Sequence, residues 1–448
     1  MPDQLTAATR RSASRPSLGD RVRQLRVARG LTQTELAGDR FSKEYVSRIE
    51  RGKTRPTGDT VEWIAARLGV DPTFLETGVS SSEHERVDSV IARAEATLES
   101  HQYAEVLPGL AEIGEALATV SAPELELRAL RTEAWARMYL GQVREAVTLL
   151  ERARGIAEMP SFTDADRADI LFRLGACRYK LTSIGTAVSL LTEALALAEG
   201  SGLPCDRLRS LIHEWRARCF YHQRDWVAAR EDVERALELA EGINDPYAMA
   251  QAHFHASVIA ERDGRWVLAR SHAERAKNLY EEIAHRANVG KLLNNLGGLN
   301  FLLGKPDEAK AYLKDAFRVA LEVGSDSDAA YAVSSLAQVH LRTGEPVLAE
   351  EQARHAIQLL GDSEDVYVLQ EIGNAQLVLG RALLEQEKLE EAEQNFELAE
   401  QTFKQVSLSS QLAAAWIAQG DLAARRNEDR RAAQLYRRAA ETLQDFRF

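Results

Sequence analysis

The side chains best suited to chemistry lie between Gln33 and Gly52, where the sequence predicts two short helices joined by a tight turn. Ser42 can cap the second helix, and Val46 and Ile49, three residues apart, give it a buried side. Its open side then carries Lys43, Glu44, Ser47 and Arg48. Arginine and lysine on such a face can meet guanine edges and phosphates. The pattern therefore predicts a helix that reads DNA.

Cap signals place further helices around this element. Thr32 stands three residues before Glu35, a reciprocal pair that opens the helix before the turn. The other helix starts are predicted at Ser17, Asp59 and Asp71, the last with Pro72 in its first turn. Residues 17–76 are therefore expected to form a five-helix DNA-binding domain, an all-α unit.

The stretch from Leu18 to Leu75 resembles the Cro and phage-repressor (XRE-type) helix-turn-helix family, on the motifs GLTQTELA, YVSRIERGKTRP and ARLGV. The turn before Ser42 is one residue shorter than is usual in that family. The resemblance implies a buried ion pair between Arg26 and Glu50. It implies base-edge contacts from Lys43, Glu44 and Arg48, and phosphate contacts from Gln33, Ser42, Lys53 and Arg55.

Charge is distributed unevenly along the 448 residues, whose formal net charge is −12. Residues 1–78 hold 14 Lys and Arg against 10 Asp and Glu, a net charge of +4. The remainder holds 42 against 58, a net charge of −16. A basic head can bind phosphates while an acidic body is repelled from DNA. The asymmetry agrees with the position of the DNA-reading motif.

The chain has the features of a cytoplasmic protein. No apolar run approaches the roughly 18 residues that a membrane span needs, and the first residues have no apolar core of a signal peptide. Its three cysteines, Cys177, Cys205 and Cys219, are too few and too scattered for a disulfide framework. Residues 1–16 are polar and are expected to be disordered. Residues 77–86 are serine- and glycine-rich at their start, which predicts a hinge.

Beyond the hinge, residues 87–448 repeat with a period near 40. Nearly all the anchors of the repeat are small residues, each preceding the second apolar turn of a helix, and another small residue follows most of them after seven positions. The anchors are Val106, Ala146, Ala187, Ala229, Ala269, Ala309, Ala349, Ala392 and Ala432. Glycine recurs twelve positions earlier, at Gly175, Gly297, Gly380 and Gly420. Small residues permit two antiparallel helices to approach closely, so the pattern predicts stacked helical hairpins.

This pattern resembles the tetratricopeptide repeat, although the period is longer than 34 residues. The cleanest unit is residues 290–323. The resemblance implies an α-solenoid of about nine helical hairpins, whose first helices line a concave groove. The alternative is a plain helical bundle, which the register of so many anchors disfavours.

Three arrangements that suggest catalysis or metal binding fail on their details. Gly298 to Pro306, GLNFLLGKP, has the wrong spacing for a phosphate loop and lacks the following Ser or Thr. His213-Glu214 begins a zinc-protease pattern that Ala217 does not complete. Cys219 and His222, with Cys205 and His213, match no zinc module. We therefore expect no catalytic residues, no metal site and no cofactor, and we do not expect an enzyme.

The domain pair resembles the peptide-pheromone receptor regulators (RRNPP type) of Gram-positive bacteria. The resemblance implies a cytoplasmic, quorum-sensing transcription regulator whose repeats bind a short signalling peptide in their groove. The alternatives are a DNA-tethered scaffold whose repeats bind another protein, and a head kept only as a dimer module. The sequence does not separate the first two.

The groove of such repeats is expected to be lined by fixed positions of the first helices. In this chain those positions hold Glu214, Arg218, Tyr221, Lys291, Asn294, Ser334 and Gln338. An asparagine can accept from a peptide N–H and donate to a peptide C=O, which makes Asn294 the main candidate. One head offers few base contacts, so we expect a homodimer on a palindromic operator in double-stranded DNA. The apolar C-terminal residues Leu435, Tyr436, Leu443, Phe446 and Phe448 suggest an interface there.

Overall fold

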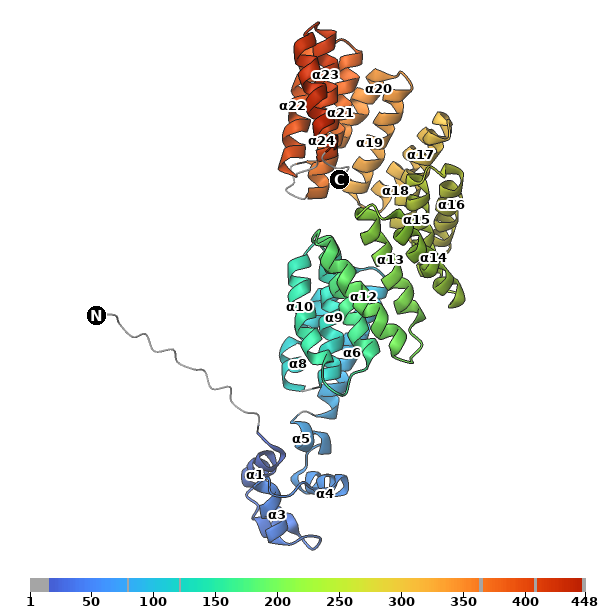
Figure 1. Cartoon of the computed structure of the whole chain (residues 1–448). Coiled ribbons are helices and arrows are strands. Elements are labelled where there is room, and N and C mark those ends of the chain that lie inside the picture. Colours follow the sequence, from blue (N-terminus) through green and yellow to red (C-terminus); the bar gives the residue numbers. More distant parts are fainter. Residues whose placement is uncertain (1–15, 79, 121, 362–365, 407–408, 445–448) are drawn as a thin grey trace, which may run out of the picture. The chain divides into compact units, whose positions relative to one another are not determined.

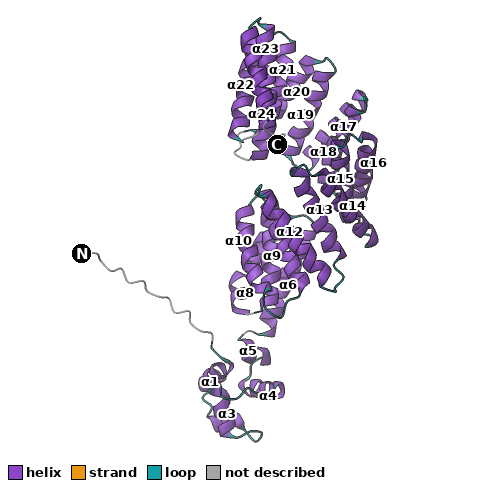
Figure 2. Cartoon of the chain, viewed as in Figure 1, coloured by secondary structure: helices purple, strands orange, loops and turns teal. Residues whose placement is uncertain are grey.

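The computed structural model describes residues 16–78, 80–120, 122–361, 366–406 and 409–444. Within these ranges the secondary structure is entirely helical, with no strand, as Figure 2 shows. The predicted all-α class is therefore confirmed. Nearly all of the tail predicted at 1–16 lies outside the described residues. Among those described, no helix is long and apolar enough to cross a membrane.

The head contains the five predicted helices. They are α1 (Leu18–Ala28), α2 (Gln33–Ala37), α3 (Lys43–Glu50), α4 (Gly58–Leu68) and α5 (Pro72–Thr77). Ser17 with Asp20 and Thr32 with Glu35 form the predicted capping boxes of α1 and α2. The apolar sides of the helices meet in one core, which includes Val46 and Ile49.

Two boundaries differ from the prediction. Helix α4 begins at Gly58 with Thr57 as its N-cap, not at Asp59, and the Thr57 and Thr60 hydroxyls pair at 2.9 Å in its first turn. The predicted hinge at 77–86 is mostly helical, since α6 (Ser81–Glu99) starts four residues after α5 ends. The Ser80 hydroxyl accepts from the backbone N–H of Glu83 and caps α6. The serines therefore open a helix instead of forming a linker.

The chain divides into two compact units, Met1–Ser201 and Gly202–Phe448. The predicted repeat domain at 87–448 extends over both units. The first unit holds the head and three hairpins, formed by α6 with α7 (Tyr103–Glu112), α9 (Pro123–Tyr139) with α10 (Val143–Ala157), and α11 (Asp164–Lys180) with α12 (Ile184–Gly200). A short extra helix, α8 (Gly114–Val120), follows α7 and was not predicted.

The second unit holds six hairpins (Figure 1). Their first helices are α13 (Asp206–His222), α15 (Pro246–Arg262), α17 (Arg286–Leu302), α19 (Asp326–Arg342), α21 (Val366–Glu385) and α23 (Ser409–Arg425). Their second helices are α14 (Trp226–Gly242), α16 (Trp266–Glu282), α18 (Pro306–Glu322), α20 (Pro346–Leu360), α22 (Leu389–Gln405) and α24 (Asp429–Gln444). The described residues therefore contain the nine hairpins that the repeat predicted.

The predicted small residues form the seam of each hairpin. All nine anchors, from Val106 to Ala432, are buried. The recurring glycines each face the side chain four residues after an anchor: a Cβ on Gly297 would lie 2.6 Å from Leu313, and one on Gly380 would lie 2.5 Å from Phe396. Where the glycine is replaced by alanine, the facing residue is smaller in two cases, Val233 opposite Ala217 and Ala353 opposite Ala337, and is again a leucine, Leu150, opposite Ala134. In most hairpins the volumes on the two sides of the seam are therefore matched.

We predict that Gly297→Ala loosens the hairpin of α17 and α18. The added methyl group would overlap Leu313 and cost about 1–3 kcal/mol, as overpacking of a filled core does. The measurement is hydrogen exchange of the amides in α17 and α18 of the full chain, which reports local opening.

Gly298→Ala is the matched control, because a Cβ there meets nothing within 4 Å. Alanine favours helix by up to about 1 kcal/mol over glycine, so this variant should exchange no faster than wild type. Equally faster amide exchange in both variants would contradict the proposed matching of volumes between Gly297 and Leu313.

Candidate DNA interface and ligand pocket

Helix α3 presents an exposed polar side built on a buried one. Val46 and Ile49 are buried, and the Ser42 hydroxyl accepts from the backbone N–H of Tyr45 at 3.2 Å, which fixes the start of the helix. The predicted DNA-contacting residues that are exposed are Ser42, Lys43, Glu44, Arg48, Lys53 and Arg55, while Ser47 is half-buried. The guanidinium of Arg48 lies 6.0 Å from the centre of the Tyr45 ring. The geometry leaves the cations of α3 and of the following loop free to meet a nucleic acid.

The predicted ion pair behind α3 is confirmed. Arg26 Nε donates to Glu50 Oε1 at 2.6 Å, and Gln33 Nε2 donates to Glu50 Oε2 at 2.8 Å. Arg26 also donates to the Leu31 carbonyl oxygen, so one guanidinium joins α1, α3 and the chain entering α2. Burial opposes ionisation of Glu50, but the hydrogen bonds from Arg26 and Gln33 outweigh it and hold the pKa of this carboxyl below its usual value. The network fixes α3 relative to the rest of the head.

The structure gives Gln33 a role that the sequence did not suggest. Its amide nitrogen is committed to Glu50, inside the head. A phosphate contact from Gln33 stays a prediction, and it would have to use the rest of the amide group.

Two exposed cations near α3 escaped the sequence reasoning. Arg40 lies in the turn before α3, and Arg51 is its C-cap residue. The signal was available, because Arg51, Lys53 and Arg55 alternate along the loop that follows the helix.

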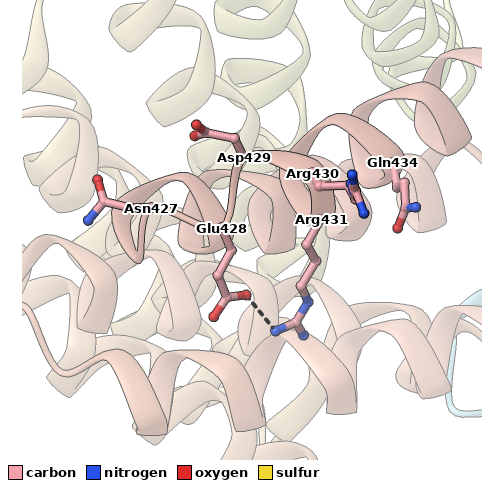
Figure 3. A pocket seen from close by; sticks show the side chains of 6 residues that line it. All are labelled: Asn427, Glu428, Asp429, Arg430, Arg431 and Gln434. Atoms are coloured by element: carbon pink, nitrogen blue, oxygen red, sulfur yellow. Dashed lines mark hydrogen bonds and ion pairs between the residues drawn. The ribbon is translucent and has the colours of Figure 1, made fainter.

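Two hollows stand out in the second unit. The larger, of about 460 Å³, lies at the turn between α23 and α24 and is drawn in Figure 3. Its lining is polar throughout, and Arg431 is held by Glu428 at 3.1 Å and by Glu393 at 2.9 Å. It comes from one turn and the start of one helix, and no aromatic or aliphatic residue lines it.

The smaller hollow, of about 270 Å³, is built by three consecutive first helices. Helix α15 contributes Phe254 and Val258, α17 contributes Gly290, Lys291, Asn294 and Asn295, and α19 contributes Asp328 and Tyr331. We call it the Asn294 pocket. Aromatic and aliphatic walls with a few convergent polar groups are typical of a binding site.

The polar groups of this pocket differ in how well they are satisfied. Asn295 accepts from the Ser257 hydroxyl at 3.0 Å and donates toward Glu261 at 3.4 Å. Burial raises the pKa of Glu261, against the effect of Arg262 and Asn295. Asn294 Oδ1, in contrast, is buried and has no hydrogen-bond partner among the residues that the structure describes. An unpaired buried acceptor costs about 1–3 kcal/mol, which a ligand donor would recover.

The other predicted groove residues divide between internal contacts and open surface. Glu214 is buried, and its carboxylate accepts from His255 Nε2 at 2.7 Å and from Arg218 at 3.4 Å. The Tyr221 hydroxyl accepts from Arg262 Nε at 2.8 Å. Ser334 is buried and Gln338 is exposed. The structure therefore brings Lys291 and Asn294 together in one pocket, and the other five lie outside its lining.

The repeat itself could have found more of the lining. Phe254 and Val258 stand 40 residues before Asn294 and Gly298, and Tyr331 stands 40 residues after Lys291. They occupy the same register as the predicted residues. The prediction selected polar groove positions and did not include the aromatic residues Phe254 and Tyr331.

Comparison with known proteins gives matches to both parts of the chain. Residues 17–77 match a family model described as a helix-turn-helix domain, and residues 178–246 and 288–361 match models of the tetratricopeptide repeat. The chain is 41% identical over 64 residues to y4dJ of Sinorhizobium fredii, an uncharacterized HTH-type transcriptional regulator. The match covers 14% of this chain and 83% of y4dJ.

Two solved structures resemble the chain over most of its length. A Rap protein complexed with competence and sporulation factor gives a TM-score of 0.60 at 16% identity and covers 81% of this chain and 98% of that one. The apo form of the quorum sensor NprR from B. thuringiensis gives 0.59 at 14% identity, with 80% and 99% covered. At these identities the likeness establishes a shared fold.

We predict that Glu50→Ala unfolds the head by stranding the guanidinium of Arg26, at a cost of about 3–5 kcal/mol. Glu62→Ala, which removes an exposed carboxylate of α4, should change the stability by no more than about 0.5 kcal/mol. Because the pKa of Glu50 is depressed in the folded head, its stabilising effect is present above the usual glutamate pKa and is lost as the pH falls through the folded value.

The measurement is the free energy of unfolding of the head, obtained from hydrogen exchange of the amides in α1 and α3 at neutral pH and in acid. The difference in unfolding free energy between wild type and Glu50→Ala should become smaller as the pH falls. A difference in unfolding free energy that does not change with pH would contradict stabilisation by an ionised Glu50.

We also predict that Arg48 and Lys53 act differently on DNA. Arg48→Ala should weaken binding to a selected site by about 1–3 kcal/mol and relax the sequence preference, since arginine on a recognition helix reads base edges. Lys53→Ala should weaken all duplexes alike and lower the salt slope by about one, as loss of a phosphate contact does. Fluorescence anisotropy with selected and random duplexes separates the two effects. Equal losses on both duplexes for both variants would refute the assignment.

Proposed function

The chain belongs to the XRE-type helix-turn-helix family of transcriptional regulators, here with tetratricopeptide repeats after a DNA-binding head, and we propose that the repeats sense a short signalling peptide. The observation that carries this proposal is the buried and unpaired Oδ1 of Asn294 in a pocket built by α15, α17 and α19. That oxygen lacks a hydrogen-bond donor, and a peptide backbone supplies one at every residue other than proline.

The chemistry of a carboxamide suits an extended backbone. Asn294 Oδ1 accepts from a peptide N–H, and its Nδ2 donates to a peptide C=O, so the contact is indifferent to the side chain. Phe254 and Tyr331 then offer aromatic walls on either side, from α15 and α19, to a side chain of the ligand. The shared fold with a quorum sensor and with a protein solved in complex with a signalling factor supports the same reading.

We place the regulator on a palindromic operator in the cytoplasm as a two-fold homodimer. A single head with one short recognition helix reads few base pairs, so two heads supply the specificity that a regulator needs. The C-terminal helix α24 is the predicted interface. Leu443 is exposed there, Leu435 packs partly against the buried Trp416, and the Tyr436 hydroxyl donates to Asp421 at 2.7 Å. Phe446 and Phe448 lie outside the described residues.

Peptide and operator affinities must be linked if the peptide regulates the head. A ligand that changes the affinity for DNA is itself bound more or less tightly in the presence of DNA by the same factor. Couplings of this kind are typically about 1–3 kcal/mol.

The test is to incubate the purified full chain with a pool of synthetic peptides of five to eight residues and to identify those that co-elute with it. Calorimetry on a retained peptide then compares wild type with Asn294→Ala, with and without a selected operator duplex. Asn294→Ala should weaken peptide binding about 5- to 150-fold, the loss expected for about 1–3 kcal/mol. Asn395→Ala, which changes a half-buried asparagine on the second helix α22 and outside the pocket lining, should bind as wild type does.

Retention of no peptide from any pool would overturn peptide sensing and leave the repeats as a scaffold for another protein. Undiminished peptide binding in Asn294→Ala would remove the Asn294 pocket from the site. A peptide affinity that ignores the operator would remove the regulatory coupling.

A further inference from the structure

The first helices of the second unit carry ten arginines and lysines within the described residues. Seven of them donate to a carboxylate or a hydroxyl oxygen: Arg207, Arg209, Arg216, Arg218, Arg262, Arg286 and Arg425. The remaining three, Lys291, Arg342 and Arg381, have no hydrogen-bond acceptor and no ion-pair partner among the described residues. They lie on three consecutive first helices, α17, α19 and α21.

Arg381 is the most unusual of the three because it is half-buried. Burial, and the like charge of Arg342, lower the pKa of Arg381, while the carboxylate of Asp421 acts in the opposite direction. That carboxylate is outside ion-pair distance of Arg381 and accepts a hydrogen bond from the Tyr436 hydroxyl at 2.7 Å. A guanidinium has five N–H donors and stays charged, so a desolvated one without acceptors is costly until an anion arrives.

Arg342 and Lys291 are unpaired in different surroundings. The guanidinium of Arg342 lies 5.9 Å from the centre of the Phe301 ring and has no carboxylate beside it. Lys291 is exposed at the rim of the Asn294 pocket. The one acid that lines that pocket among the described residues, Asp328, is paired with Ser325, the N-cap of α19. The Ser325 hydroxyl donates to the Asp328 carboxylate and accepts from the Asp328 backbone N–H. Each of the three cations is therefore available to a ligand.

Their spacing indicates the size of that ligand. Helix α19 packs against both α17 and α21, and packed helices lie about 8–10 Å apart, so two steps span roughly 16–20 Å. In the register of the repeat, Arg381 stands about two turns further along its helix than Lys291 does, which adds roughly 10 Å along the axis. The diagonal of roughly 20 Å exceeds a single small acid or a nucleotide. At about 3.3 Å per residue it matches an extended peptide of about six residues.

We propose that the ligand is an acidic peptide, one carboxylate of which is bound by Lys291 and another by Arg342 together with Arg381. The inference rests on the proposed function, because it assigns the chemistry of the peptide that lies across the Asn294 pocket. Gln338 lies on α19, in the same register as Arg381, and is exposed on the path between the two ends. The acidic net charge of this part of the chain does not suggest a preference for acidic peptides. The preference comes locally from the three unpaired cations.

The test uses two pools of synthetic heptapeptides that differ only in charge. The first pool is rich in Asp and Glu, and the second has Asn and Gln at the same positions with an amidated C-terminus. The full chain is incubated with each pool, and retained peptides are identified by mass spectrometry. We expect retention from the acidic pool at least tenfold above the neutral pool, and weaker retention at high salt.

The variants are Lys291→Gln and the double variant Arg342→Gln with Arg381→Gln. Each should lower affinity for a retained acidic peptide at least tenfold and leave the affinity for its Asn and Gln analogue unchanged. The matched control is Lys314→Gln, which removes an exposed, unpaired lysine from the second helix α18 and should bind as wild type does. Because Arg381 has no partner to lose, its variant should unfold at the same temperature as wild type or above it.

The outcomes separate the two claims. Neutral peptides retained as well as acidic ones, or acidic binding unchanged in the double variant, would overturn the acidic preference while peptide sensing stands. A lower unfolding temperature in Arg381→Gln would show that the guanidinium serves the fold, which also overturns the inference. Retention from neither pool would overturn both claims together.

Discussion

Each repeat hairpin depends on the close approach of two helices, which a small residue on the first makes possible for a larger one on the second. Gly175, Gly297, Gly380 and Gly420 face Leu191, Leu313, Phe396 and Tyr436, each so closely that an added Cβ would force the facing side chain to shift. Glycine weakens a helix, so its recurrence is explained by packing and not by helix propensity. Where the first helix has alanine, the facing side chain is often smaller, and the volume is conserved.

This seam determines which residues remain for binding. Because the small residues turn toward the partner helix, the first helices present their other sides to the neighbouring hairpins and to ligands. Most charged groups there have hydrogen-bond partners, either within the hairpin, as Arg216 with Asp232, or in the next one, as Glu214 with His255. Polar groups without a partner among the described residues, such as Asn294 Oδ1, are costly in the free protein. A binding site built from such groups gives up stability that a ligand returns.

The head obeys a different constraint, since its helices are too short to be stable alone. One buried carboxylate, Glu50, collects donors from Arg26 and Gln33 and so joins α1 and α2 to the recognition helix. Arg21 on α1 donates to the carbonyl oxygens of Leu75 and Glu76 and holds the end of α5. Because the buried carboxylate of Glu50 is paired with Arg26, the head can expose cations on one side of α3 without leaving an unpaired charge in its core. The charge of the chain is divided in the same way, between a basic head and acidic repeats.

The Arg26–Glu50 pair was implied by the resemblance to a known family. The sequence by itself determined the helix class, the five helices of the head, all of their caps except that of α4, and the register of nine hairpins. These follow from local spacing, which capping and small-residue packing read directly. Tertiary structure alone decided the division at Ser201, the helical start at Ser81 and the commitment of Gln33 to Glu50. It also decided which polar side chains are satisfied. Glu214, Asn294 and Arg381 look alike in sequence as polar residues on first helices, but a side chain's partners come from the neighbouring hairpins, about 40 residues away.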